Sequence, residues 1–372
     1  MTRFLQDILR QPAELHRVID RLRGEDRRAI EEAAEKIRKA RYVYVTGIGS
    51  SWHAALSVQP LFQLGGQPVC LQDAAELWQF SSIPADAILV IISRSGRSLE
   101  VVNLLAKARE SHALVVGITN SEDGSLAKEA DISIVVPIEF DHTISVNTYS
   151  SLAATAGALA AATVGSFDDG LAGELLTAVD ALVNSLPRWQ AQIRESAWPA
   201  PGSIYYFLGR GGGLGSCHEA RLLWEEGVKS AAAAMNTSSF RHGPQEMVAT
   251  GARFAVWIDG QRMRQQDLAV VRDLTLLNAR VLLIGQNLPE RAGDLVLQLP
   301  QAPPDWQFLI DIIPAQLAAE HLAHLSGTDP DSFRYCSYIV EDEFGLMQEK
   351  ARLATESSET GLAAFSPTRE NL

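Results

Sequence analysis

Apolar residues recur along the chain in short, nearly continuous runs rather than in alternation with polar residues. The first half holds four such runs: Tyr42–Gly47, Ile88–Ser93, Leu114–Asn120 and Asp131–Pro137. Near-continuous runs rich in Val, Ile and Leu are typical of strands in a parallel sheet that is covered on both faces. Helical patterns such as Leu99–Arg109 lie between them. This alternation of strands and helices predicts a doubly wound α/β sheet.

The second half of the chain contains four similar runs in the same order. The corresponding runs are Ile204–Gly209, Phe254–Asp259, Val281–Asn287 and Asp294–Pro300, each 162 to 167 residues later. Four matches in one order indicate an internal repeat, and therefore two copies of one fold. We expect an α/β chain with two tandem doubly wound parallel-sheet domains of the flavodoxin-like kind, with flanking helices.

The same pattern suggests how the chain is divided. A long helical region, Gly170–Arg194, ends in the loop Trp198–Gly202 and separates the two halves. The Ala-rich stretch Leu152–Gly165 is too short and too weakly apolar to cross a bilayer, which predicts a tightly packed helix or a dimer contact. The expected parts are an N-terminal helical segment (residues 1–28), a first domain (29–185), a second domain (186–335) and a C-terminal tail (336–372).

Composition narrows the classes of function. The chain has 372 residues, of which 47% are hydrophobic and 21% charged, as in an ordinary globular protein. Its net charge of -13 disfavours nucleic acid, because phosphate backbones are bound mainly through excess Lys and Arg. A small phosphate remains compatible, since backbone N–H groups and hydroxyls can hold it locally. No apolar run reaches about 18 residues and the start has no apolar signal core, so we expect a cytoplasmic protein that binds no membrane.

Cysteine and histidine give no sign of a disulfide framework or a metal site. The three cysteines, Cys70, Cys217 and Cys336, form no CxxC pair and do not cluster with histidine. His321 and His324 have a spacing that suits a metal, but no carboxylate pattern singles them out. We therefore expect no metal and no organic cofactor.

Two loops between an expected strand and an expected helix carry candidate chemistry, because ligands of open parallel sheets bind at the carboxyl ends of the strands. The first loop is Gly47–Ser51 (GIGSS). Its glycines allow a close backbone approach, and Ser50 and Ser51 add hydroxyl donors. A tight structural connection explains this loop equally well, and Trp52 breaks the GxGxxG pattern.

The second loop, Ser93–Ser98 (SRSGRS), is more specific. Three hydroxyls and two guanidinium groups gather in six residues that open a helix. Free N–H groups, the helix dipole and hydroxyl donors all favour an anion at such a helix start. A single serine would serve as an N-cap without any ligand, but three serines with arginine exceed what a cap needs. The predicted phosphate-binding residues of this loop are Ser93, Arg94, Ser95 and Ser98.

These loops and three further stretches resemble one family. The loop SRSGRS resembles the phosphate loop S-x-S-G-x-S/T of sugar isomerase (SIS) domains, and GSSWHAAL resembles the preceding loop in the isomerase half of glucosamine-6-phosphate synthase. Glu219–Glu226 (EARLLWEE), Phe240–Pro244 (FRHGP) and Ile313–Asp331 resemble later motifs of that enzyme in the same order. From about residue 4 to about residue 341, the chain is similar to tandem SIS-domain phosphosugar isomerases and deaminases.

The resemblance implies a site that both halves build. Ser50, Ser51 and the second loop would hold the phosphate of a hexose or hexosamine 6-phosphate. Glu226 would be the general base that moves a proton between C1 and C2 of the open-chain sugar. Glu219, two helical turns earlier on the same face, would support it. His242 would assist ring opening and, in the related proteins, enters the site of the neighbouring subunit, which implies a homodimer.

The chain also departs from the synthase. Tyr338 stands where the synthase has the lysine that forms a Schiff base with the ketose, so we expect no such chemistry at this position. A tyrosine can still hydrogen-bond a sugar hydroxyl. The amidotransferase half, with its N-terminal catalytic cysteine, has no counterpart in the sequence, so we expect no glutamine-dependent amidotransferase activity.

Two classes of function stay open at this point. The first is an enzyme that isomerises a sugar phosphate, deaminates an amino-sugar 6-phosphate, or cleaves a sugar–amine 6-phosphate adduct. The arginine in FRHGP, where the synthase has lysine, resembles the deaminases and the adduct-cleaving deglycases of the superfamily. The second is a non-catalytic protein that senses a sugar phosphate. The missing lysine favours the sensor, whereas the presence of Glu226 and His242 disfavours it. From the sequence alone, Glu226 can also be a solvated helix charge, and His242 can simply shape a Gly-Pro turn.

Overall fold

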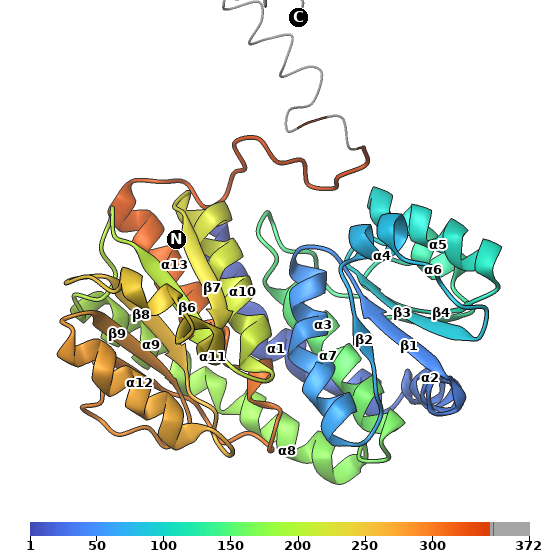
Figure 1. Ribbon diagram of the computed structural model, residues 1–372, viewed down its shortest axis with the longest axis horizontal. Helices are drawn as coiled ribbons and strands as arrows, with labels where there is room; N and C mark the ends of the chain where they lie inside the picture. The colour runs from blue at the N-terminus through green and yellow to red at the C-terminus, as the bar shows by residue number, and fades with distance from the viewer. Residues whose placement is uncertain (343–344, 346–372) are drawn as a thin grey trace, which may run out of the picture.

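Two five-stranded sheets form the body of the protein and lie side by side (Figure 1). The computed structural model describes residues 1–342 and 345. The first sheet contains β1 (Tyr42–Thr46), β2 (Cys70–Leu71), β3 (Ala87–Ser93), β4 (Leu114–Thr119) and β5 (Ile132–Val135). The second sheet contains β6 (Tyr205–Gly209), β7 (Ala232–Asn236), β8 (Arg253–Trp257), β9 (Arg280–Gly285) and β10 (Leu295–Gln298).

Both sheets have the same strand order. The first runs β2-β1-β3-β4-β5 and the second runs β7-β6-β8-β9-β10, with all neighbouring strands parallel. An order of 2-1-3-4-5 is that of a flavodoxin-like doubly wound sheet. The prediction of two tandem doubly wound α/β domains is therefore confirmed.

All eight apolar runs singled out in the sequence form strands, and two strands were missed. β2 is only two residues long, too short to give a pattern. β7 is built from alanines, Met235 and Asn236, and all five of its residues are partly exposed, as suits the edge of a sheet. An alanine run favours a helix on propensity alone, so the pairing with β6 overrides the local preference.

Helices connect the strands and cover both sheets. Those before β6 are α1 (Arg3–Arg23), α2 (Arg27–Lys39), α3 (Ser50–Leu64), α4 (Ala74–Phe80), α5 (Leu99–Ser111), α6 (Ser125–Glu129), α7 (Asn147–Thr163), α8 (Asp169–Asp180) and α9 (Leu182–Glu195). Those after β6 are α10 (Gly213–Leu223), the π-helical turn η1 (Trp224–Val228), α11 (Thr237–Phe240), η2 (Pro244–Met247), α12 (Arg264–Leu276), η3 (Gln307–Leu309) and α13 (Ile313–Ser326). The single helical region expected over residues 170–194 is thus two helices, divided at Ala181.

The Ala-rich stretch forms α7, a helix packed within one chain. Sixteen of its seventeen residues are buried, and α1, α2 and α3 pack against it. Small side chains let these helices approach closely, which explains the high alanine content of this stretch. None of the described helices is long and apolar enough to span a bilayer.

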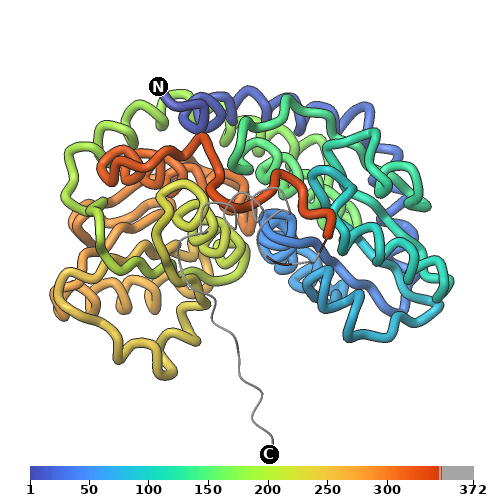
Figure 2. Tube along the Cα trace, turned by 90° about the horizontal axis from the view of Figure 1, so that it is seen from above, coloured from blue at the N-terminus to red at the C-terminus, as the bar shows by residue number. Residues whose placement is uncertain are grey.

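Helix α1 ties the two ends of the described chain together. Figure 2 shows it running along one side of both domains. The carboxylate of Asp331, which follows α13, accepts the backbone N–H groups of Arg3 and Phe4 at 2.8 Å each and so caps the helix start. Farther along α1, the buried amide of Gln11 donates to the side-chain oxygen of Gln316 at 2.6 Å.

The two domains meet where α3 of the first packs against α10 of the second. A Cβ atom added at Gly215 of α10 would lie 2.1 Å from Oγ of Ser57 and 2.4 Å from the carbonyl oxygen of His53. Only a residue without a side chain fits between the helices at this point. The contact therefore fixes the distance between the two domains.

Replacing Gly215 with alanine is expected to lower the free energy of unfolding by about 1–3 kcal/mol, because the added methyl group forces α3 and α10 apart. Gly173→Ala is the matched control: this glycine of α8 has nothing within 4 Å of its Cβ position, so alanine is expected to stabilise by about 0.4–1 kcal/mol. Chemical denaturation of both variants measures the difference. Equal stability of Gly215→Ala and the wild type would contradict the close approach of the helices.

Candidate functional site

The loop between β1 and α3 is shaped by its two glycines. Gly49 has a φ of +56°, in the left-handed region that favours glycine. A Cβ at Gly47 would lie 2.7 Å from the backbone carbonyl carbon of Ser51, so a side chain there would collide with the first turn of α3. The loop thus presents Ser50 and Ser51 at the start of a helix, where backbone N–H groups favour an anion.

The loop Ser93–Ser98 makes a second helix start beside the first, between β3 and α5. The hydroxyl of Ser93 accepts the N–H of Gly96 at 3.0 Å, and that of Ser95 accepts the N–H of Arg97 at 3.2 Å. Ser98 is the N-cap residue of α5, yet its side chain makes no capping hydrogen bond. Capping therefore does not account for Ser98.

Both loops open into a cavity of about 270 Å³, which we call the first cavity. Its remaining walls come from the η1 turn, from residues 143–145 and from the segment 333–340 that follows α13. Figure 2 shows this last segment crossing from the second domain to the first. The structure brings these predicted residues together in one cavity wall: Ser50, Ser51, Ser93, Arg94, Ser95, Ser98, Glu226 and Tyr338.

Glu226 lies on a π-helical turn, not on a regular α-helix. The expectation that Glu219 and Glu226 are separated by two regular turns on one face is therefore wrong, because α10 ends at Leu223 and η1 follows it. A π turn holds more residues than an α turn and so changes the direction of the side chains it carries; such turns are frequent at functional sites. Glu226 lines the cavity, whereas Glu219 lies behind its wall.

The surroundings of Glu226 favour its protonated form. The pKa of this carboxyl is raised to about 8: burial is the largest cause, the neighbouring carboxyl of Glu219 acts in the same direction, and the cations of Arg94 and Lys229 oppose it. A carboxyl with a pKa near neutrality is a stronger base than an ordinary glutamate and can still lose its proton at physiological pH.

Glu219 is buried against helix α3 and has two partners there. The hydroxyl of Ser50 donates to Oε1 at 3.0 Å, and the ring Nδ1 of His53 lies 2.7 Å from Oε2. Burial raises the pKa of Glu219 to about 8 and lowers the pKa of His53 to about 3, so the pair carries no net charge near neutral pH. Glu219 therefore holds the hydroxyl of Ser50, a residue that lines the cavity.

His53 is a residue of this cluster that the sequence analysis missed. It stands three residues after Ser50 in GSSWHAAL, and a spacing of three places both side chains on one face of α3. That spacing was a usable signal. Its acidic partner, 166 residues away, could not be identified without the fold.

The segment after α13 is held against the second loop by Arg94 and Tyr338. The guanidinium of Arg94 stacks on the Tyr338 ring at 4.0 Å and donates to its carbonyl oxygen at 2.5 Å. The Tyr338 hydroxyl donates to the carbonyl of Asp141 at 3.1 Å, and the N–H of Leu99, the first residue of α5, donates to the carbonyl of Val340 at 3.1 Å. Of the predicted tail, residues 343–344 and 346–372 lie outside the described residues.

His242 does not line the first cavity of its own chain. It is exposed in the turn between α11 and η2, where the next residue, Gly243, has a φ of +124°. Among the described residues, no three His, Cys, Asp or Glu side chains are grouped as a metal site would require.

Comparison with known proteins identifies the domain type. Residues 36–164 match the SIS domain. The chain is 25% identical over 352 residues to glutamine–fructose-6-phosphate aminotransferase (isomerizing) of Pyrococcus horikoshii, which covers 91% of this chain and 57% of that protein. The chain spans about half the length of the curated relatives it matches.

Two solved structures show the same fold over nearly the whole chain. The C-terminal domain of glucosamine-fructose-6-phosphate aminotransferase from Francisella tularensis superposes with a TM-score of 0.79 at 19% identity, covering 88% of this chain and 97% of that one. Glucosamine-6-phosphate deaminase from Thermotoga maritima superposes with a TM-score of 0.77 at 22% identity, covering 92% and 100%. The likeness shows that these chains share the fold of two doubly wound domains.

The burial of Glu226 is expected to make stability depend on pH. With a pKa of about 8 in the native state and an ordinary value near 4.5, the native state binds this proton more tightly than the unfolded chain does. Between these two values the free energy of unfolding therefore falls as the pH rises, by at most about 1.4 kcal/mol per pH unit. Glu226→Gln removes this loss, so its stability relative to the wild type is expected to grow from about pH 5 to about pH 8.

Chemical denaturation at several pH values measures this difference. Glu225→Gln is the matched control, since the adjacent carboxylate is exposed and pairs with Arg221 at 2.6 Å. A constant difference between Glu226→Gln and the wild type, or equal growth in Glu225→Gln, would show that the carboxyl of Glu226 is not desolvated.

Proposed function

From the SIS domain in its first half, we propose that this chain is an enzyme that processes a hexose or hexosamine 6-phosphate by moving a proton between C1 and C2. One observation carries the proposal: two hydroxyl-bearing helix starts and a carboxyl of raised pKa open into the same cavity. The two helix starts suit the phosphate, and the carboxyl of Glu226 suits the reacting carbons.

The phosphate end is formed by the two loops of the first domain. Ser51, Ser93 and Ser95 are buried hydroxyls that lie at or beside helix starts, and Ser98 adds a hydroxyl not used for capping. A dianion gains from the helix dipoles, from backbone N–H groups and from charge-assisted hydrogen bonds to these hydroxyls. The Arg94 guanidinium, stacked on Tyr338, adds a positive charge at the same end.

The reacting end is formed by Glu226. In the open-chain sugar, its carboxylate takes the proton from the carbon next to the carbonyl and gives an enediol or enolamine. It then returns the proton to the neighbouring carbon. For a sugar with an amino group at C2, this step gives an imine that water hydrolyses to a ketose 6-phosphate and ammonia. Isomerisation and deamination therefore share the proton transfer, and the substrate decides between them.

Ring opening is assigned to His242 of a second subunit. The imidazole can donate and accept a proton near neutral pH, but in one chain it stands on an exposed turn away from the first cavity. A homodimer in which this turn enters the partner's cavity would complete the site. Position 338 is a tyrosine and has no amine that could form a Schiff base with the sugar. Proton transfer therefore proceeds on the free open-chain sugar.

Proton exchange in deuterated water tests the enzyme. Wild-type protein is expected to exchange the C1 or C2 proton of at least one sugar in a panel of hexose and hexosamine 6-phosphates, followed by NMR together with ammonia release. Glu226→Gln is expected to lower the exchange rate by a factor of about 10²–10⁴, while Glu225→Gln keeps it. Because the base must be deprotonated, the rate is expected to rise with pH up to about 8.

The same assay distinguishes the enzyme from the alternative, a sugar-phosphate sensor. The tyrosine at position 338 favours the sensor. Sugars that raise the melting temperature of the wild type without any proton exchange would replace the enzyme by the sensor.

Mixing two inactive variants tests the contribution of the second subunit. If His242 acts across the dimer, Glu226→Gln and His242→Asn subunits that have exchanged partners are expected to recover roughly a quarter of the wild-type activity, since each mixed dimer contains one complete site. Activity that stays at the level of the separate variants would place both residues in the same chain's site or remove His242 from the chemistry.

A further inference from the structure

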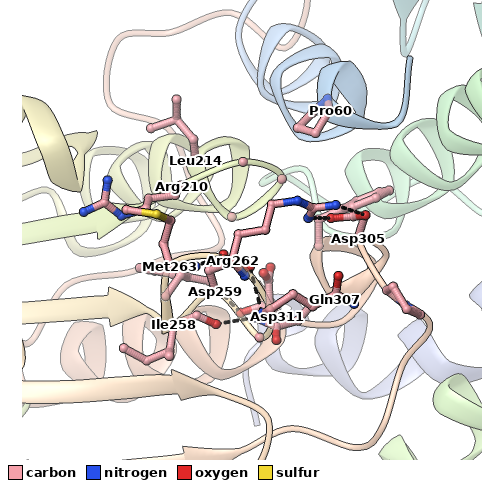
Figure 3. A pocket seen from close by; sticks show the side chains of 18 of the residues that line it. Pro60, Arg210, Leu214, Ile258, Asp259, Arg262, Met263, Asp305, Gln307 and Asp311 are labelled. Carbon is pink, nitrogen blue, oxygen red and sulfur yellow. Dashed lines mark hydrogen bonds and ion pairs between the residues drawn. The ribbon is translucent and has the colours of Figure 1, made fainter. Parts of the chain in front are cut away.

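The second domain has a larger cavity of its own at the same edge of its sheet. This second cavity measures about 790 Å³ and lies at the carboxyl ends of β6, β8 and β9, with α3 of the first domain on its opposite side. Figure 3 shows Asp259, Gln307 and Asp311 on the side of the second sheet and Pro60 of α3 across from them. A volume of several hundred Å³ is typical of a small-molecule site.

The loops of the second cavity correspond in position to the phosphate loops of the first domain. The turn after β6, Arg210–Gly213, stands where Gly47–Ser51 stands after β1, and the loop after β8 stands where Ser93–Ser98 stands after β3. The chemistry differs, because the second pair of loops contains no serine. The loop after β8 begins instead with a carboxylate, Asp259.

The carboxylate of Asp259 already fills the anion site at the start of α12. It accepts the backbone N–H groups of Gln261, Arg262 and Met263 at 3.2, 2.8 and 2.6 Å. These are the groups that would bind a phosphate oxygen at this helix start. An incoming phosphate would meet a negative charge in the place it needs.

A second carboxylate stands at the start of α10. Asp311 is fully buried, lines the cavity and accepts the hydroxyl of Ser216, in the first turn of α10, at 2.5 Å through Oδ1. Its other oxygen, Oδ2, would lie 3.8 Å from a Cβ at Gly213, the first residue of α10. That oxygen makes no hydrogen bond to any described residue, although it is buried. A buried acceptor without a partner indicates a donor that a ligand supplies.

Both arginines of the second cavity form ion pairs with other groups of the chain, but the buried Nη2 of Arg210 has no hydrogen-bond partner among the described residues. Arg210 pairs with the buried Asp267 at 2.7 Å, and Arg262 pairs with Asp305 at 2.5 Å (Figure 3). With these two cations paired, Asp259 and Asp311 are the remaining carboxyl groups of the lining, and burial raises the pKa of Asp311 to about 7. The carboxylate of Asp259 occupies the helix start that a phosphate would need, whereas the unpartnered Oδ2 of Asp311 and Nη2 of Arg210 suit a neutral ligand that carries both donors and acceptors.

The other polar groups of the lining suit hydroxyls. Eight side-chain amides face the cavity, among them Gln59, Asn236, Gln261 and Gln307. Each amide offers both donors and acceptors, as a sugar hydroxyl does. Apolar side chains between them, such as Leu214, can cover the C–H faces of a ring.

We propose that the second cavity binds a sugar that carries no phosphate group, such as a hexose or a hexosamine, with the free oxygen of Asp311 accepting one of its hydroxyl or amino groups. This site is separate from the phosphosugar chemistry assigned to the first cavity and does not depend on it.

A variant that fills the cavity tests the site without removing buried contacts. Gly260 lines the cavity, has no positive φ, and a Cβ there would meet only Oε1 of Gln307 at 3.9 Å, so Gly260→Trp can fold and occlude the space. Gly173→Trp, on α8 and outside both linings, is the matched control. Glucose, glucosamine and inorganic phosphate are titrated into the full chain by calorimetry and by saturation-transfer NMR.

Glucose or glucosamine is expected to bind the wild type, Gly173→Trp and Ser95→Ala alike, and to bind Gly260→Trp at least tenfold more weakly. Saturating inorganic phosphate is expected to leave this binding unchanged. The proposal is overturned if neither sugar binds the wild type, if Gly260→Trp binds as tightly as Gly173→Trp, or if phosphate competes for the cavity. Loss of sugar binding in Ser95→Ala but not in Gly260→Trp would assign the sugar to the first cavity instead. None of these results bears on proton exchange by Glu226.

Discussion

Helices α3 and α10 touch at Gly215 with no side chain between them, and this contact sets the geometry of the first cavity. It holds Ser50 and His53 of one domain against Glu219 of the other. Under the proposed function, the base and the phosphate site come from different domains and must be held rigidly, since a shift of about 1 Å is enough to disable a site. Close packing of two helices supplies that rigidity more reliably than surface ion pairs can.

Most of the fold could be predicted from the sequence because its strands are nearly continuous apolar runs, a signal that is local. The edge strand β7 was not, because its alanines gain their extended conformation only from pairing with β6. The position of the two serine loops after β1 and β3 was predictable for the same reason as the strands: their serines and glycines are neighbours in sequence. The π turn at Glu226 could not be predicted, since nothing in the sequence WEEGV distinguishes a π turn from a regular helix. Tertiary packing decides that difference.

The two domains share a strand order but treat their helix starts in opposite ways. In the first domain, serine hydroxyls stand at the starts of α3 and α5; α3 has no acidic residue in its first turn to act as a fixed counter-charge, whereas α5 has Glu100. In the second domain, Asp259 and Asp311 supply that negative charge from the chain itself. One backbone arrangement can thus present an attractive field for anions in one copy and a balanced field in the other. The carboxylates lie 52 residues apart, so only the folded sheet reveals that they share a cavity.

The cap on α1 has a consequence for how the protein is made. Helix α1 is made before the carboxylate that caps its start, because that carboxylate belongs to Asp331, about 330 residues later in the chain. At ordinary rates of synthesis, that partner follows on the order of tens of seconds later. During this interval the apolar face of α1 has no α13 to pack against, and the segment 333–340 that closes the first cavity does not yet exist. The first cavity therefore cannot be completed until residues 333–340 have been made.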